Sequence, residues 1–162
     1  MKINTSPLYL QNLRLLKLMR LTSPSLPIGG YSYSQGLEFA VSSDWVHDRA
    51  TTSDWIEGLL RSSLVHLDLP ILKRLYESWQ ELDFEKVSYW NNFMSASRDS
   101  FELQEEDRQM GKALARLLVD LDIKESRNYL TPPFGGFLTL FSLAAVKWEI
   151  SLNDTASGFL WM

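Results

Sequence analysis

Apolar residues recur at intervals of three and four along most of the chain, which is the spacing of an α-helix with one buried face. The segment at residues 10–22 is rich in leucine, with Arg14 and Lys17 three apart on its polar side. It ends at Ser23 and Pro24, because a proline disfavours helical backbone in the residue before it. No run alternates with period two for long enough to predict a strand. The pattern predicts an all-α fold, a compact bundle of about seven or eight helices.

N-cap residues and prolines predict where the later helices begin. Pro70 follows Asp68 closely, and a proline is tolerated in the first turn of a helix but disrupts its middle. We therefore expect the chain to restart at Asp68, with its carboxylate as the N-cap. Other starts are expected at a capping box of Thr51 with Asp54, at Asp83 and at Asn153, and further helices at residues 34–42, 98–121 and 134–148.

The segment at residues 134–148 is apolar on nearly all faces, which is typical of a central buried helix. The helix at 98–121 carries a leucine-rich face and a densely acidic first half. The last helix is expected to turn Phe159, Leu160 and Trp161 inward. Another apolar face is predicted for Trp55, Ile56, Leu59, Leu60, Leu64 and Leu67.

Composition narrows the function classes. The 162 residues fit one domain, residues 1–162, and 45% of them are hydrophobic. The chain has no cysteine, which excludes disulfides, thiolate metal sites and a cysteine nucleophile. A net charge of −4 disfavours a nucleic-acid partner. Residues 134–148 are too few to span a bilayer, and no secretory signal is visible, so a soluble cytoplasmic protein without membrane contact is expected.

The loop at residues 30–36 comes nearest to a catalytic motif. Ser32 and Ser34 each match only half of the nucleophile-elbow pattern, and no strand is predicted before them. A tight turn whose serines cap a helix is the simpler interpretation. A partner-binding surface built on Tyr31 and Tyr33 is the alternative, since large amphipathic side chains beside a rigid turn are typical of interfaces. A helical enzyme that uses this loop is the third alternative.

Two other groups of side chains bear on chemistry. His66 and Asp68 supply half of a metal site, which leaves a stand-alone metal carrier as an alternative, although one imidazole and one carboxylate do not complete a coordination sphere. His47 beside Asp48 indicates a surface pair. In the acidic helix, Glu102 and Glu105 fall three apart on one face, as do Glu105 and Arg108. Such carboxylates suit a solvated helix start, a charged docking surface or an acid–base pair.

A longer match carries more information than any of these signals. The segment LMRLTSPSLPIGGYSYSQGLE at residues 18–38 closely resembles the N-terminal signature of the urease accessory protein UreF family. Further matches follow in order: WV at 45–46, LDLP at 67–70, RLY at 74–76, SRD at 97–99, LQEEDRQMG at 103–111 and GFLW at 158–161. The resemblance covers residues 13–161.

The resemblance implies an all-α protein that forms a homodimer, has no cofactor and no catalytic residue of its own, and is not an enzyme. Members of this family bind the accessory protein UreD, also called UreH, and with it recruit the nickel-carrying GTPase UreG. The assembly delivers nickel to apo-urease and couples GTP hydrolysis to metal release. Nickel binding is accordingly implied only at the level of the complex.

Site residues are carried over from the same motifs. Glu38 matches the glutamate of the Gly-Leu-Glu motif, which implies a place on the surface that faces the GTPase, with Tyr31, Ser32, Ser34 and Gln35 beside it. The structural alternative is that Ser34 or Gln35 caps the helix while Glu38 supports the loop. Arg98, Glu105 and Arg108 match the family's charged helix, where packing and docking are both open.

The match departs from the family at its end. Family members continue past the GFLW motif, whereas this sequence ends at Met162. The expectation is a UreF-like domain that lacks the family's C-terminal helices, which leaves Phe159, Trp161 and part of the helix at residues 134–148 uncovered. Such an apolar patch favours aggregation or burial by a partner. The chain alone is then expected to bind UreD and UreG weakly.

Overall fold

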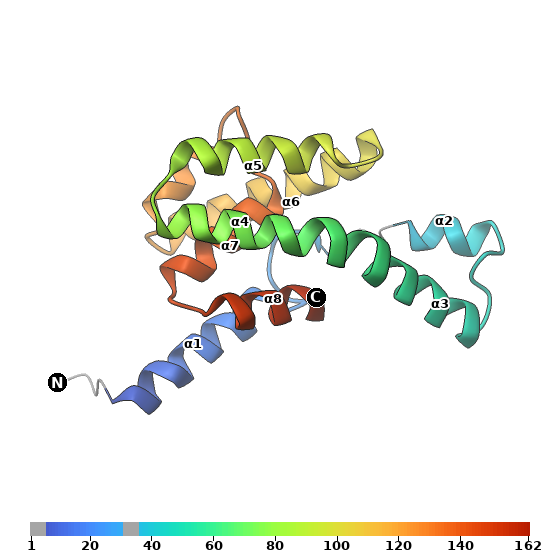
Figure 1. Cartoon of the computed structure of the whole chain (residues 1–162), viewed down its shortest axis with the longest axis horizontal. Helices are drawn as coiled ribbons and strands as arrows, with labels where there is room; N and C mark the ends of the chain where they lie inside the picture. The colour runs from blue at the N-terminus through green and yellow to red at the C-terminus, as the bar shows by residue number, and fades with distance from the viewer. Residues whose placement is uncertain (1–5, 31–35) are drawn as a thin grey trace.

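A computed structural model describes residues 6–30 and 36–162 of the chain. Every regular element in this part is helical, which confirms the predicted all-α class (Figure 1). The α-helices are α1 (Pro7–Leu21), α2 (Leu37–Ser42), α3 (Arg49–Leu59), α4 (Leu69–Gln80), α5 (Phe84–Ala96), α6 (Phe101–Asp120), α7 (Phe137–Lys147) and α8 (Leu152–Trp161). A π-helix, η2 (Leu60–Asp68), lies between α3 and α4, and a 3-10 helix, η3 (Lys124–Tyr129), lies between α6 and α7.

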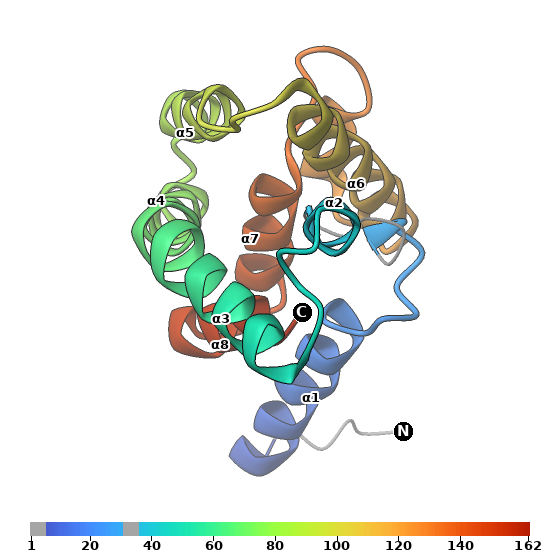
Figure 2. The ribbon, with the colours of Figure 1, turned by 90° about the vertical axis from the view of Figure 1, so that its right-hand side faces the viewer.

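Helix α7 forms the centre of the molecule. All residues from Phe137 to Ala145 are buried, as the apolar pattern on every face predicts. The expectation that part of this helix is left uncovered is therefore wrong for these residues. The helix packs mainly against α4 and α6, and Figure 2 shows it surrounded by the other helices. Polar groups in this core are hydrogen-bonded: the Trp79 indole donates to the Thr139 carbonyl at 3.0 Å, and the Tyr76 hydroxyl donates to the Ile150 carbonyl at 2.7 Å.

The predicted restart at Asp68 is wrong. Asp68 has helical backbone angles and makes no side-chain cap, and α3, η2 and α4 run on as one continuous rod (Figure 1). A proline inside an α-helix clashes with the carbonyl four residues before it. We attribute the continuity to the wider π-helical turns before Pro70, which relieve this clash without ending the helix.

The helix caps agree in part with the sequence. Asp83 accepts from the Lys86 amide at 3.0 Å, as predicted. Asp48, instead of Thr51, caps α3 in a capping box, so this helix starts earlier than predicted. Ser151, instead of Asn153, caps α8. The reason is the same in both cases: the cap residue needs extended backbone angles, which Asp48 and Ser151 have.

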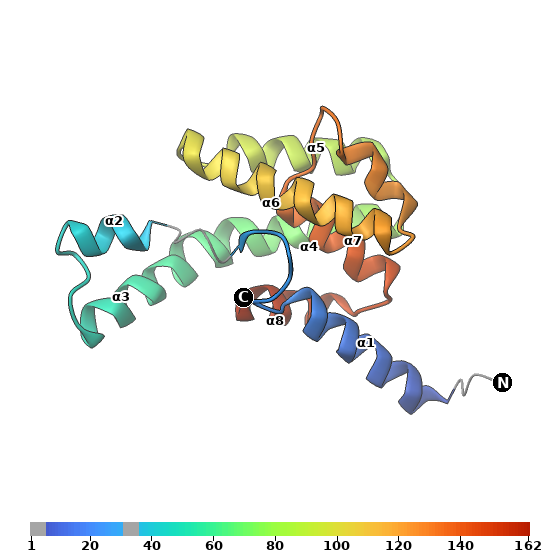
Figure 3. The same ribbon diagram turned by 180° about the vertical axis from the view of Figure 1, so that it is seen from behind.

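Several helices at the periphery carry exposed apolar side chains. Helix α1 buries only Leu21 among its residues and projects away from the body (Figure 3). Helix α8 packs through Thr155 and Gly158, so Leu160 is 40% exposed and Trp161 is 81% exposed. The prediction that Leu160 and Trp161 point inward is wrong, because successive residues of a helix point to different sides. Phe159 packs against the core beside Phe141, as predicted. Among the described residues, no helix combines the length and apolarity that a bilayer crossing requires.

Helix α3 also departs from its predicted apolar face. It buries none of its residues, and Ile56 is 52% exposed. Helix α2 buries only Ala40. The residues from Gly36 to Leu59 are called the arm below; they project from the body at the end where α5 joins α6 (Figure 1).

Candidate functional site

Four of the predicted partner-binding residues, Tyr31, Ser32, Ser34 and Gln35, lie outside the described residues. Gly36, the next residue along the chain, occupies the N-cap position of α2 with φ of 84°, a backbone conformation that favours glycine. Glu38 lies in the first turn of α2 and is exposed, on a helix that buries Ala40 alone. A carboxylate at this place suits the positive end of the helix dipole and is accessible to a partner.

Glu105 and Arg108 form an ion pair on the surface of α6. The Gln109 amide also donates to Glu105, at 2.5 Å, and these hydrogen bonds lower the pKa of Glu105. The Arg108 guanidinium lies over the Phe134 ring, with 5.2 Å from Cζ to the ring centroid. This part of α6 therefore presents paired charges beside an aromatic ring.

Arg98 lies in a different environment. It comes from the short α5–α6 loop, and its Nη2 lies 3.0 Å from Asp68 Oδ1 and 3.8 Å from Asp107 Oδ1. The side chains of Arg98, Asp68 and Asp107 are only 21%, 2% and 10% exposed. We call these three residues the clamp. Arg98 and Asp68, which it joins, are 30 residues apart in sequence.

The two carboxylates of the clamp have further partners. The Ser63 hydroxyl donates to Asp68 Oδ2 at 3.2 Å, and the Phe137 amide, at the start of α7, donates to Asp107 Oδ1 at 3.2 Å. Gly136 also lies against Asp107, since a Cβ on it would come within 2.1 Å of Oδ2. The clamp thus ties η2, the α5–α6 loop, α6 and the start of α7 to one point.

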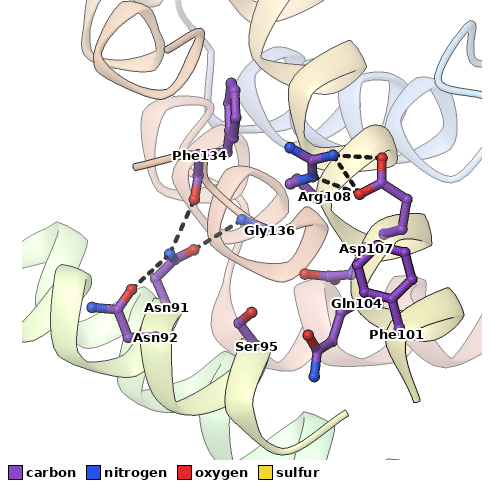
Figure 4. A pocket seen from close by; sticks show the side chains of 10 residues that line it. Asn91, Asn92, Ser95, Phe101, Gln104, Asp107, Arg108, Phe134 and Gly136 are labelled. Atoms are coloured by element: carbon purple, nitrogen blue, oxygen red, sulfur yellow. Dashed lines mark hydrogen bonds and ion pairs between the residues drawn. The ribbon is translucent and has the colours of Figure 1, made fainter. Parts of the chain in front are cut away.

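A cavity of about 430 Å³ lies between α5, α6 and the loop before α7 (Figure 4). Asn91 points across it, accepting from the Gly136 amide at 2.9 Å and donating to the Phe134 carbonyl at 3.2 Å. Ser95 supplies the one hydroxyl of the described lining, which contains no histidine. The lining is Asn91, Asn92, Ser95, Phe101, Gln104, Glu105, Asp107, Arg108, Phe134 and Gly136.

The acid–base alternative does not fit the electrostatics of α6. Such a pair requires two carboxyls whose pKa values are pushed apart. The pKa of Glu102 is lowered by a backbone hydrogen bond and by the Ser100 hydroxyl, and that of Glu105 is lowered as well. Burial instead raises the pKa of Glu106 and of Asp107. Sequence reasoning did not single out Asp107, because nothing in its neighbourhood distinguishes it from the other acids of this helix.

His66 and Asp68 do not form the half of a metal site that the sequence analysis considered. His66 is exposed on η2, whereas the Asp68 carboxylate is buried and bound to Arg98. In the part of the chain that the structure describes, no three metal-ligating side chains gather. His47 Nδ1 lies 3.7 Å from Asp44 Oδ1, so its partner is Asp44, while the predicted partner Asp48 caps α3.

Asp107 is expected to make the stability of the protein respond to pH. Burial raises its pKa above the ordinary value of 3.8, against the opposing effects of Arg98 and the Phe137 amide. The folded state then holds this proton at a higher pH than the unfolded state does, so protonation favours folding. As the pH falls towards 3.8, the wild type is expected to gain stability relative to Asp107→Asn, whose amide oxygen still accepts from Phe137.

The measurement is the free energy of unfolding by urea for both proteins at a series of pH values. Taking the difference at each pH cancels the contributions of carboxyls that do not interact with Asp107, whereas Glu106 and Asp68 are coupled to it. A difference that stays constant, or that changes in favour of Asp107→Asn on acidification, would contradict the assignment.

Comparisons with known proteins bear on this arrangement. The model of the UreF family matches residues 46–162. The urease accessory protein UreF of Alkalilimnicola ehrlichii is 45% identical over 145 residues, which are 90% of this chain and 64% of that protein. The UreF proteins of Teredinibacter turnerae and Hahella chejuensis are 46% and 42% identical, over 93% and 92% of this chain and 67% of each relative. The chain thus spans about two thirds of the length of these relatives.

Proposed function

Because the chain belongs to the UreF family of urease accessory proteins, we propose that it acts as a scaffold in urease maturation and carries out no catalysis itself. In this proposal it binds UreD, and the two proteins recruit the nickel-carrying GTPase UreG. The assembly then delivers nickel to apo-urease in the cytoplasm and couples GTP hydrolysis to metal release. The observation that carries the proposal is the UreF match over residues 46–162.

The surface chemistry is compatible with this role. Helix α2 and the first half of α6 lie toward the same end of the molecule, which Figure 2 faces. Helix α2 carries Glu38, and the first half of α6 carries the Glu105–Arg108 pair. Charged side chains in such positions steer association and select partners more than they hold them. We assign Glu38, Glu105 and Arg108 to the UreG-facing surface, together with Tyr31, Ser32, Ser34 and Gln35. The geometry around Arg98 supports a packing role for that residue.

Exposed apolar side chains on α1 support the homodimer. Leu8 is 67% exposed, Leu16 is 62% exposed and Met19 is 60% exposed. Large apolar side chains that gather at a surface mark protein–protein contacts.

Co-purification from cells that also produce UreD and UreG tests the proposal. Two forms are compared: this chain, and the same chain extended by the part of the Alkalilimnicola ehrlichii relative that follows the matched region. We expect the extended form to retain both partners and the shorter form to retain less of each. Absence of both partners from both forms would refute the proposed function.

Variants locate the surface. Glu38→Ala in the extended form is expected to reduce the amount of retained UreG. Glu85→Ala is the matched control, since Glu85 is also a glutamate in the first turn of a helix, on α5. Equal retention of UreG by the two variants would remove Glu38 from the docking surface. The double substitution Ser32→Ala and Ser34→Ala is expected to lower partner retention at most, because a scaffold has no turnover to lose.

A further inference from the structure

We propose that the Asp68–Arg98–Asp107 clamp is a positioning device that fixes the angle of the arm against the α5–α6 pair. It thereby sets the position of Glu38, on the arm, relative to Glu105 and Arg108, on α6. This inference rests on the proposed function for its consequence, partner binding. The fixed angle of the arm is argued only from the contacts of the clamp.

The arm depends on its base for its orientation. Helix α3 buries no residue, α2 buries only Ala40, and neither packs extensively against helices α4–α8. The arm continues directly into η2, whose only buried residue is Asp68. Apolar packing therefore does little to fix the arm, and its orientation is determined where η2 meets the body.

The π-helical turns make this junction sensitive. A π-helical segment is a departure from the regular hydrogen-bond ladder, and helices bend at such segments. The direction in which the rod leaves the body therefore depends on what holds η2. Leu67 of η2 packs against the core, and the Asp68 carboxylate adds directional contacts with the Arg98 guanidinium at 3.0 Å and the Ser63 hydroxyl at 3.2 Å.

Charge pairing at this point gives a directional restraint. Hydrogen bonds between a guanidinium and a carboxylate have a narrow geometry, whereas apolar contacts are non-directional. Arg98 is itself anchored from the other side, since its carbonyl accepts from the Gln104 amide at 3.3 Å and its guanidinium lies 3.8 Å from Asp107. The base of the arm is thus oriented relative to α6, which carries Glu105 and Arg108.

The clamp can be tested by a distance measurement, because the chain has no cysteine of its own. Spin labels are attached to Ser53→Cys on α3 and Ser88→Cys on α5, both exposed, and the distance between them is measured by pulsed electron paramagnetic resonance. We expect a narrow distribution in the parent protein. Arg98→Lys, which keeps the charge but loses the planar fork, is expected to broaden or shift it.

A second variant and a control separate positioning from general destabilisation. Asp68→Asn keeps the shape of the side chain and is expected to broaden the distribution in the same way. Arg61→Lys is the control, because Arg61 also lies on η2 but pairs with Glu57 at the surface, where its side chain is 78% exposed. Circular dichroism verifies that each variant is folded. A distribution that stays narrow in folded Arg98→Lys and Asp68→Asn would overturn the inference.

The consequence for binding is measured separately. If a tenth of the molecules hold the arm at the productive angle, the apparent affinity for UreG in the presence of UreD falls about tenfold. Arg98→Lys is expected to show this loss while Arg61→Lys does not. Broadening without any loss of affinity would overturn the positioning role. The affinities are measured in the extended form described above. Absence of binding by the extended form without substitutions would instead count against the proposed function, and the distances would still decide on the clamp.

Discussion

Gly111→Ala is expected to lower the free energy of unfolding by about 3 kcal/mol, at the upper end of what overpacking of a core usually costs. Gly111 lies on α6 where the loop before α7 crosses it. A Cβ at this position would come within 2.1 Å of the Gly135 carbonyl oxygen and 2.7 Å of the Gly136 carbonyl carbon. Both contacts are with backbone, so no flexible side chain can move aside. The loop must shift, and with it the start of the buried helix α7.

Gly58→Ala is the matched control for this effect. Gly58 also lies inside a helix, α3, but a Cβ there meets nothing within 4 Å. Alanine is the better helix former by about 1 kcal/mol, so this variant is expected to be more stable than the wild type. Urea unfolding followed by circular dichroism measures both changes. Gly111→Ala with wild-type stability would show that α6 and the loop do not approach each other as closely as the structure has them.

Arg98→Met is expected to lower the free energy of unfolding by about 3–5 kcal/mol, the usual cost of removing one partner from a buried ion pair. The variant leaves Asp68 and Asp107 without their shared cation. Asp68 is only 2% exposed, so water cannot compensate for the loss. Methionine retains much of the apolar stem of arginine, and the change therefore reports mainly on charge.

Arg61→Met removes the same side chain from an exposed pair on the same rod. Surface ion pairs contribute about 0–1 kcal/mol, so a small effect is expected. Urea titration of each variant gives its free energy of unfolding. The comparison separates the contribution of the buried ion pair from that of the exposed one. Similar losses in both variants would mean that Arg98 is not shielded from solvent in the folded protein.

The all-α class and the central helix could be predicted from the sequence because they depend on local pattern. Residues 134–148 are apolar on nearly every face, and such a helix is stable only when others surround it. The observed helix, Phe137–Lys147, is shorter because Gly136 takes the N-cap position. The cap at Asp83 was equally predictable, since it needs only the backbone amide of Lys86 three residues later.

The sequence alone does not rule out a helix restart at Asp68. An aspartate shortly before a proline satisfies every local criterion for a helix start. Two features of the fold decide against it: the π-helical turns before Pro70 let the helix continue, and Arg98, 30 residues later, binds the Asp68 carboxylate. The same long-range pair explains why the role of Arg98 stayed open between packing and docking. Sequence spacing carries no signal for contacts of this kind.

The candidate site was predictable in its exposed parts only. The surface pairing of Glu105 with Arg108 follows from their spacing of three on a helix, and the structure contains it. The cavity beside them could not be predicted, because it depends on where the loop with Phe134 and Gly136 passes over Asn91. Asp107 was equally hidden, since its burial results from the packing of α6 against α7.

The most direct test of the proposed scaffold role is the activation of purified apo-urease by UreD, UreG, nickel and GTP, with and without this protein. Both the chain and its extended form are assayed, and the urease activity and bound nickel are measured. We predict that activation requires one of these forms, and that Arg98→Lys in the more active form reduces it while Arg61→Lys does not. Activation that is equal with and without the protein would contradict the scaffold role.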